Sequence, residues 1–336
     1  MKRSAVTNFA KALLFAICLA LLLWMVLVAG PEQLWQTLIS MPWTIAGCVA
    51  IWGIGYLLNA ESFRLILHAM CESASADRKI LSRWKVLRLT IAGYAINYIT
   101  PFGLLGGEPY RVIALRPVLG AEKATQSVLL YSMMHIGSHF CLWLLAIAWA
   151  VLALREQLAG YWTGLVVTLI VLCALLALMW YCYRHGVMLR FMKRWVDWPL
   201  LNPSLLPTSV FVRSLLLELI SRLANICEYW LVMQALGFDQ FGYADALLVV
   251  AFSSLLMNIL FFSPLQMGTR EGGIMLALQL LVPSVAAHVA AGAPMLAIAV
   301  ALSFATRLRE FIWIVIGIAM LRMKETSDKE KIEKTK

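Results

Sequence analysis

Charged residues are scarce in this chain of 336 residues: Asp, Glu, Lys and Arg make up 14%, whereas 62% of the residues are hydrophobic. Soluble domains carry about a quarter charged residues, so this composition excludes an ordinary soluble protein. Apolar runs long enough to cross a bilayer recur from one end of the chain to the other. We therefore predict an all-α polytopic membrane protein with about six to eight transmembrane helices.

The sequence also lacks the usual patterns for metals, redox chemistry and nucleic acid. Its seven cysteines form no C-x-x-C pair. His135 and His139 are four residues apart, which suits a metal, but no carboxylate or cysteine joins them at helical spacing, so we expect no metal and no cofactor. The net charge of +10 arises from short loops between apolar runs rather than from a basic stripe with interleaved aromatics. We expect no nucleic-acid partner.

The distribution of basic residues predicts the topology. Spanning helices are expected at residues 12–29, 42–63, 124–153, 162–183, 208–236 and 294–321. Lys and Arg gather in the loop 64–88, after Tyr181 and from Arg322 onward, so these segments are expected in the cytoplasm. Segments 30–41, 237–245 and 283–293 contain no Lys or Arg, and segment 154–161 contains only Arg155, so these four are expected on the other side.

The same pattern predicts where the protein resides and how it is divided. Lys2, Arg3 and Lys11 precede an apolar run that is longer than a signal-peptide core, which favours an uncleaved first helix. Both termini are then cytoplasmic, in a plasma membrane of the bacterial inner-membrane type. We expect a single membrane domain over residues 1–323 and a charged, disordered cytoplasmic tail over residues 324–336.

Two polar, glycine-rich breaks interrupt the apolar pattern, one in each half of the chain. The first runs from Pro101 to Glu108 and the second from Pro264 to Glu271. Each has an asparagine before it and an arginine close by: Asn97 and Arg111 at the first break, Asn258 and Arg270 at the second. Broken backbone is tolerated in hydrocarbon only where protein or water surrounds it. A matching pair of breaks therefore indicates a transporter-like site.

The predicted topology requires the segments around both breaks to enter and leave the membrane on one side. Segment 89–123 would form a re-entrant hairpin from the cytoplasm, and segment 246–282 one from the outside. Halves 1–153 and 161–323 would then form an inverted repeat, an arrangement that supports alternating access. Residues 243–263 are also long enough to span alone, in which case only part of the symmetry survives.

Charged residues also lie within the predicted helices. Each unpaired charge at the bilayer centre costs about 3 kcal/mol, so such residues mark a functional site unless they pair. As an alternative, Arg222, Arg307 and Arg309 could simply neutralise Glu218, Glu271 and Glu310 as structural ion pairs. The charged residues at the breaks and within the helices form a set of five acidic and five basic members, a balance that suits a zwitterion or an anion: Glu108, Glu218, Glu228, Glu271 and Glu310, with Arg111, Arg222, Arg270, Arg307 and Arg309. The candidate substrate-binding residues are Asn97, Glu108, Arg111, Glu218, Arg222, Asn258, Arg270, Glu271, Arg307, Arg309 and Glu310. We expect Glu108, Arg111, Arg270 and Glu271 to converge near the midplane.

The breaks carry a family resemblance. Asn97-Tyr98-Ile99-Thr100-Pro101, followed by Gly106-Gly107-Glu108 and Arg111, resembles the N…P…GE…R signature of the lysylphosphatidylglycerol synthase transmembrane-region family. The stretch from Pro264 through Gly268-Thr269-Arg270-Glu271-Gly272 is similar to that family's second element. The resemblance covers nearly the whole chain and implies transfer of phospholipid between leaflets. The chain ends soon after its last helix, so synthase activity is not implied.

Two classes of function follow. The first is a flippase that binds phospholipid or another anionic or zwitterionic lipid, with the head group held by buried Arg and Glu. The alternative is a membrane partner or regulatory subunit acting with lipid-linked substrates. An enzyme is disfavoured because the sequence shows no nucleophile–base pair and no carboxylate-rich metal motif. Self-association, lipid class, direction and energy source are left open.

Overall fold

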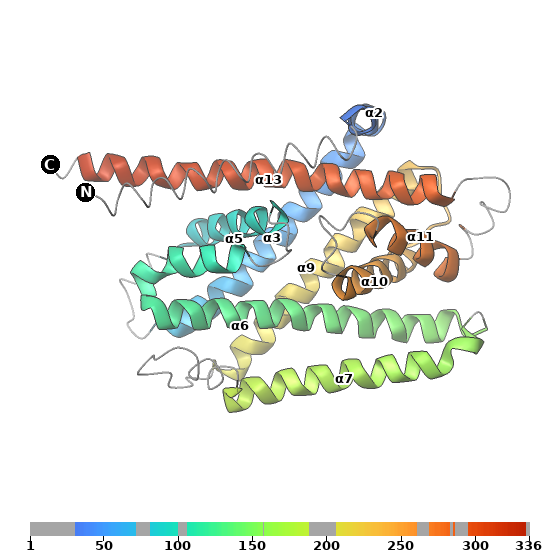
Figure 1. Ribbon diagram of the computed structural model, residues 1–336, viewed down its shortest axis with the longest axis horizontal. Helices are drawn as coiled ribbons and strands as arrows, with labels where there is room; N and C mark the ends of the chain where they lie inside the picture. Colours follow the sequence, from blue (N-terminus) through green and yellow to red (C-terminus); the bar gives the residue numbers. More distant parts are fainter. Residues whose placement is uncertain are drawn as a thin grey trace.

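The protein is helical throughout the part that the structure describes. The computed structural model describes residues 31–71, 81–99, 106–156, 158–187, 206–260, 269–282, 285 and 295–333, and no β-strand occurs among them. The predicted first helix, 12–29, lies outside these residues. Figure 1 shows the described helices, some of which run along the molecule's longest axis while others cross it obliquely. They are α2 (Pro31–Ser40), α3 (Pro42–Met70), α5 (Arg83–Ile99), α6 (Gly107–Ala153), α7 (Trp162–His185), α9 (Thr208–Ala235), α10 (Tyr243–Ile259), α11 (Thr269–Leu281) and α13 (Met295–Glu333), with a short 3₁₀ turn, η1, at Ala159–Tyr161.

Within these residues, three helical stretches are long and apolar enough to cross a membrane: Pro42–Met70, Gly107–Ala153 and Ala159–His185. Tyr243–Ile259 is apolar but shorter. Helices α9 and α13 were also predicted to span, and at 28 and 39 residues they are long enough. Both carry several charged side chains, which lowers their apolarity. The predicted all-α membrane fold is confirmed.

Several predicted boundaries are wrong. Residues 64–70 continue α3 and residues 83–88 begin α5, so helix extends into the expected loop 64–88 from both sides. Segment 30–41, predicted only as a connection, contains α2, which begins at Pro31, a residue well suited to the first turn of a helix. The last helix does not end at 321 but continues to Glu333, so residues 324–333 of the predicted tail are helical. Its Lys and Glu residues are good helix formers, which favours this continuation.

Small residues bring α3 and α9 together as an antiparallel pair. Ser62 Oγ donates to the carbonyl of Ser214 at 3.1 Å, and Ser214 Oγ donates to that of Ser62 at 3.3 Å. About two turns further along α9, Ser221 Oγ donates to the carbonyl of Gly55 at 3.2 Å. Close approach through Gly and Ser is the usual way that helices associate in lipid. This pair forms the centre of the molecule.

The first break is flanked by a helical hairpin. Pro117 and Gly120 interrupt α6, and Gly120 has φ 78° and ψ 165°, so the helix changes direction there. The short first segment, residues 107–119, returns beside α5, and the long segment, residues 121–153, then runs through the bundle (Figure 1). The predicted spanning helix 124–153 therefore corresponds to the second segment of α6.

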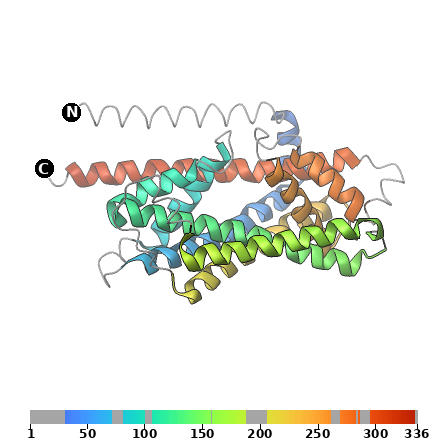
Figure 2. The same ribbon diagram turned by 60° about the horizontal axis from the view of Figure 1, so that its bottom comes forward.

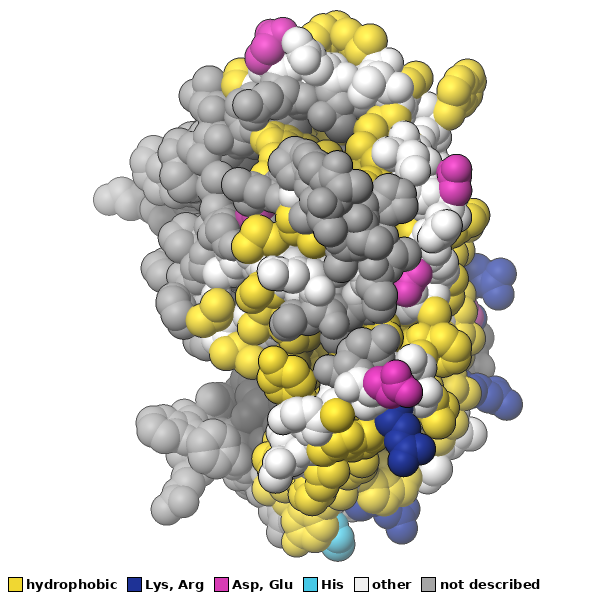
Figure 3. All heavy atoms as spheres, turned by 90° about the vertical axis from the view of Figure 1, so that its right-hand side faces the viewer, with side chains coloured by type: hydrophobic (Ala, Val, Ile, Leu, Met, Phe, Trp, Pro, Cys, Tyr) yellow, Lys and Arg dark blue, Asp and Glu magenta, His cyan; other side chains and the backbone are white. Residues whose placement is uncertain are grey.

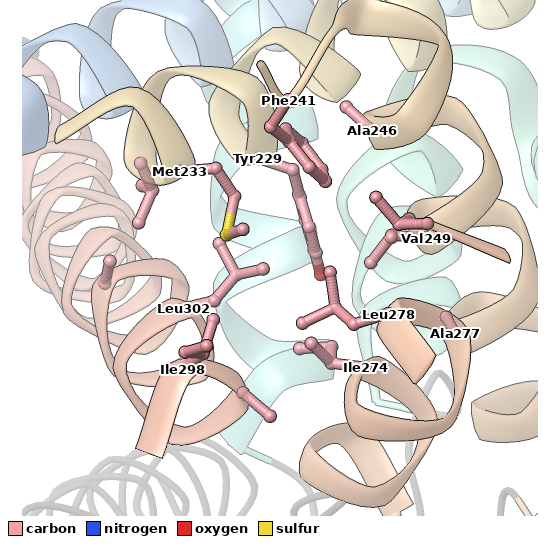
Figure 4. Packing of buried hydrophobic residues seen from close by; sticks show 14 of the residues in the cluster. Tyr229, Met233, Phe241, Ala246, Val249, Ile274, Ala277, Leu278, Ile298 and Leu302 are labelled. Atoms are coloured by element: carbon pink, nitrogen blue, oxygen red, sulfur yellow. The ribbon is translucent and has the colours of Figure 1, made fainter. Parts of the chain in front are cut away.

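The second break is also flanked by a helical hairpin, formed by α10 and α11. Asp245 Oδ2 accepts a hydrogen bond from the Gly242 amide at 2.8 Å and so caps the start of α10. Figure 4 shows buried side chains of this hairpin, among them Val249, Ile274 and Leu278, meeting Tyr229 and Met233 of α9. Ile298 and Leu302 of α13 complete the same core. The second hairpin is thus held by apolar packing against α9 and α13, two helices that also carry buried charges.

The two hairpins lie toward opposite ends of the molecule. Figures 1 and 2 place α5 and the start of α6 toward the end where α13 finishes, and α10 and α11 toward the other end. Figure 3 looks at that second end, where the described surface is mainly apolar or uncharged and basic side chains are few. Two hairpins that enter the membrane from opposite sides would have this arrangement. Whether they are re-entrant in a membrane stays a prediction.

Candidate functional site

At the first break, an asparagine and an arginine hold one glutamate. Arg111 Nη1 donates to Glu108 Oε1 at 3.0 Å, and Asn97 Nδ2 donates to the same oxygen at 3.3 Å. Asn97 Oδ1 accepts from the Gly107 amide at 2.6 Å. Glu108 lies in the first turn of α6, whose positive end favours a carboxylate. Asn97 therefore joins the end of α5 to the start of α6 across the break.

The Arg111 side chain is 1% exposed and lies between aromatic rings. Its guanidinium carbon is 4.9 Å from the ring centroid of Tyr94 and 5.3 Å from that of Tyr131, both within range of a cation–π interaction. Gly93 leaves room for the Arg111 side chain, because an added Cβ at residue 93 would be 2.5 Å from Arg111 Nε. Glu108, in contrast, keeps 28% of its side chain exposed.

We predict that Gly107→Ala destabilises the protein by about 1–3 kcal/mol, the usual cost of overpacking. A Cβ on Gly107 would be 2.2 Å from the backbone oxygen of Gly93, which has no freedom to rotate away. Thermal unfolding of the purified protein in detergent measures this effect. Gly160→Ala is the matched control, because a Cβ there has no neighbour within 4 Å. Equal melting temperatures for the two variants would show that the α5–α6 contact is looser than described.

At the second break, Glu271 has a corresponding arrangement. It lies in the first turn of α11, and its Oε1 accepts from Arg307 Nη2 at 2.9 Å and from Ser303 Oγ at 2.6 Å. Arg307 is buried on α13, whereas Glu271 keeps 21% of its side chain exposed. Both breaks thus place a partly exposed glutamate at the start of a helix, bound by a buried arginine.

A buried ion pair joins Arg309 of α13 to Glu228 of α9. Arg309 binds Glu228 with two hydrogen bonds of 2.8 and 2.7 Å, and the two side chains are 3% and 0% exposed. Trp52 Nε1 donates to Glu228 at 2.6 Å, and the Arg309 guanidinium lies 3.6 Å from the Trp52 ring centroid. Glu310 connects this pair to the break, since its Oε1 is 2.9 Å from Arg270 Nη1 and 3.6 Å from Arg309 Nη1.

Glu218 and Arg222 do not pair with each other, although they lie four residues apart on α9. Glu218 Oε2 is 2.8 Å from His135 Nδ1 on α6. Arg222 donates to Ser138 Oγ and, at 2.8 Å, to the carbonyl of His135. Within the described residues, Arg222 forms no ion pair with a carboxylate. The alternative in which Arg222 neutralises Glu218 therefore finds no direct ion pair, although the two charges still interact electrostatically.

The predicted site residues thus fall into connected groups with one exception. Asn258 is exposed and donates to the Ser254 carbonyl of its own helix at 2.7 Å, so it joins no other candidate. At the end of α5, Asn97 binds Glu108, and the neighbouring Tyr98 interacts electrostatically with Arg270, Arg309 and Glu310. This is compatible with the predicted convergence, which stays a prediction.

Sequence reasoning missed the neutral partners of these charges. Trp52, Ser303 and Tyr94 lie far along the chain from the charges that they contact, and nothing in their local sequence indicates the contact. His135 was noticed only for its spacing from His139. Among the described residues, no group of three or more His, Cys, Asp or Glu could hold a metal ion.

Comparison with known proteins agrees with the motifs at the two breaks. The model of the family described as "Lysylphosphatidylglycerol synthase TM region" matches residues 9–305. No curated protein and no solved structure matches the chain significantly. The match includes both breaks and ends just before Arg307, Arg309 and Glu310 of α13. The chain therefore belongs to the lysylphosphatidylglycerol synthase transmembrane-region family.

Proposed function

We propose that this protein moves phospholipid between the two leaflets of its membrane and holds the head group at the two breaks. The observation that carries the proposal is the matched pair of glutamates. Glu108 and Glu271 each begin a helix that follows a break, each contacts a buried arginine at 3.0 or 2.9 Å, and each keeps about a quarter of its side chain exposed. A purely structural ion pair has no need of this shared geometry. Family membership supports a lipid-related role.

The chemistry of the first break suits a zwitterionic head group. Within the part of the chain that the structure describes, Glu108 Oε2 is buried and has no hydrogen-bond partner, so it can accept from an ammonium group. Arg111 Nε is likewise buried without an acceptor, and an arginine fork suits the oxygens of a phosphate. The positive helix start adjoining Glu108 adds a second attraction for the phosphate. A lipid that carries both groups would satisfy the open donor and the open acceptor together.

Transport fits these residues better than catalysis. The glutamates at both breaks are bound by arginines, which leaves them poorly placed to accept or deliver a proton during a reaction. Hairpins that point toward opposite ends of the molecule suit alternating access, because one break can open to each side. We infer that the acyl chains stay in lipid while the head group passes between the breaks.

The proposed inverted hairpins predict a specific labelling pattern. In a variant without native cysteines, a cysteine at Arg116 should react with a membrane-impermeant reagent only from the cytoplasmic side. A cysteine at Asp239 should react only from the opposite side, because segment 237–245 lacks Lys and Arg. The measurement is labelling of intact and inverted vesicles. Reaction of position 116 from outside would contradict the inverted arrangement.

Head-group selectivity tests the proposed function. Full-length protein reconstituted in proteoliposomes is assayed with labelled phospholipids that share acyl chains and differ in head group. We expect zwitterionic amino lipids to move faster than a lipid whose head group is phosphate alone, which cannot donate to Glu108. No movement of any labelled lipid above protein-free vesicles would overturn the proposal and favour a partner or regulatory subunit instead.

A further inference from the structure

We propose that Glu218 and His135 form a proton-binding site that couples lipid movement to a proton gradient. This inference rests on the proposed function and concerns its energy source. Most buried charges in the set defined above are matched: Glu108, Glu228, Glu271 and Glu310 each contact an arginine. Glu218 is 1% exposed and contacts only an imidazole by ion-pair distance. It is the glutamate of this set whose charge a proton can most readily remove.

The geometry of the pair supports proton exchange. The 2.8 Å separation between Glu218 Oε2 and His135 Nδ1 requires one proton between them, on oxygen or on nitrogen. Glu218 Oε1 is buried and has no hydrogen-bond partner among the described residues, so a negative charge there is only partly satisfied. His135 keeps 23% of its side chain exposed, which offers a route for a proton to reach the buried carboxylate.

The pair is joined to the first break by a continuous set of contacts. Tyr94 Oη lies 3.0 Å from both His135 Nδ1 and Tyr131 Oη. The rings of Tyr94 and Tyr131 face Arg111, which binds Glu108. Addition of a proton at Glu218 therefore changes a charge that is linked through two side chains, His135 and Tyr94, to the arginine that positions the break. Such a link is what coupling between proton and lipid requires.

Glu218 is the group that changes charge in the proposed step, and the side chains around it come from four helices. The titratable and charged side chains that face it are Tyr94 from α5, Arg111, Tyr131 and His139 from α6, and Arg222 from α9, while α3 contributes the neutral Asn59 and Ser62. Arginine stays protonated in proteins. In the proposed step, the Glu218 carboxylate takes a proton from hydronium, giving a carboxylic acid and water. Release on the other side reverses this reaction.

The test measures lipid distribution under an imposed proton gradient. Full-length protein is reconstituted with a labelled phospholipid, the membrane potential is clamped at zero, and a gradient of about one pH unit is applied. One proton per lipid then supports up to about tenfold accumulation in one leaflet, reversing when the gradient is reversed. Glu218→Gln should lose the response to the gradient. Glu218→Asp should retain the response, as should Glu156→Gln, an exposed control outside the set.

The outcomes separate this inference from the proposed function. If the wild type moves lipid but ignores the gradient, or if Glu218→Gln responds like the wild type, the proton site is wrong while the flippase stands. If the wild type moves no lipid, the proposed function fails, and infrared spectroscopy of the folded protein decides on proton binding. A carboxylic-acid band that titrates with pH should then be missing from Glu218→Gln and present in Glu156→Gln. Identical spectra would overturn the site.

Discussion

Replacing Arg309 with glutamine is expected to destabilise the folded protein by about 3–5 kcal/mol, because it leaves the Glu228 carboxylate buried without a cation. Glu228 is 0% exposed, so water has no access to compensate. Trp52 would lose its stacked guanidinium and retain only one hydrogen bond to the stranded carboxylate. Chemical or thermal unfolding in detergent measures this loss.

Two further variants serve as controls for Arg309→Gln. Arg213→Gln removes an exposed arginine from α9, the helix that carries Glu228, and should leave stability nearly unchanged. Replacing Arg309 and Glu228 together by Met and Leu should recover most of the stability, since a buried ion pair and a well-packed apolar pair are often equivalent. A single Arg309→Gln variant as stable as the wild type would show that the pair is wetter than described.

Replacing Arg307 with glutamine should have the opposite signature, with a large loss of transport and a small loss of stability. Loss of a charged hydrogen-bond donor of about 1.5–3 kcal/mol corresponds to roughly a tenfold to hundredfold slower movement of lipid. Stability suffers less than at Arg309 because Glu271 is 21% exposed and keeps its hydrogen bond from Ser303. The rate of lipid movement in proteoliposomes and the melting temperature are measured on the same preparation.

The double variant Arg307→Gln, Glu271→Gln separates a substrate-binding role from a structural one. If the pair only neutralises charge, removing both members should restore activity together with stability. If the pair binds the head group, stability should return while transport stays slow. The structure decides which residues to combine, because Arg270, the chain neighbour of Glu271, contacts Glu310 rather than Glu271. Normal transport by the double variant would remove Arg307 and Glu271 from the proposed site.

Much of the architecture could be predicted because lipid imposes simple rules on sequence. Hydrophobic runs located α3, α7, α9 and most of α13, and the glycine-rich breaks marked the segments that separate α5 from α6 and α10 from α11. Composition alone could not place the exact ends, since the charged residues after Leu321 favour a helix as much as a tail. The short α2 was missed because ten residues with mixed polarity give no clear signal.

The partners of the buried charges could not be predicted for a different reason. Sequence spacing reveals only neighbours on the same helix, so Glu218 and Arg222 were grouped while His135 was not. The contacts that decide the site join residues 83 positions apart for His135 and Glu218, and 176 apart for Trp52 and Glu228. Only the packing of α3, α6, α9 and α13 brings these side chains together.

The most direct test of the account is leaflet exchange in unilamellar proteoliposomes that contain the purified full-length protein. A labelled phospholipid starts in both leaflets, and a membrane-impermeant quencher is added outside. We expect wild-type protein to make nearly all of the label accessible, whereas vesicles without protein should lose only the outer-leaflet signal. With Arg307→Gln, the inner-leaflet signal should be lost roughly tenfold to hundredfold more slowly than with the wild type. Wild-type vesicles that lose no more signal than protein-free vesicles would contradict the claim that this protein moves phospholipid.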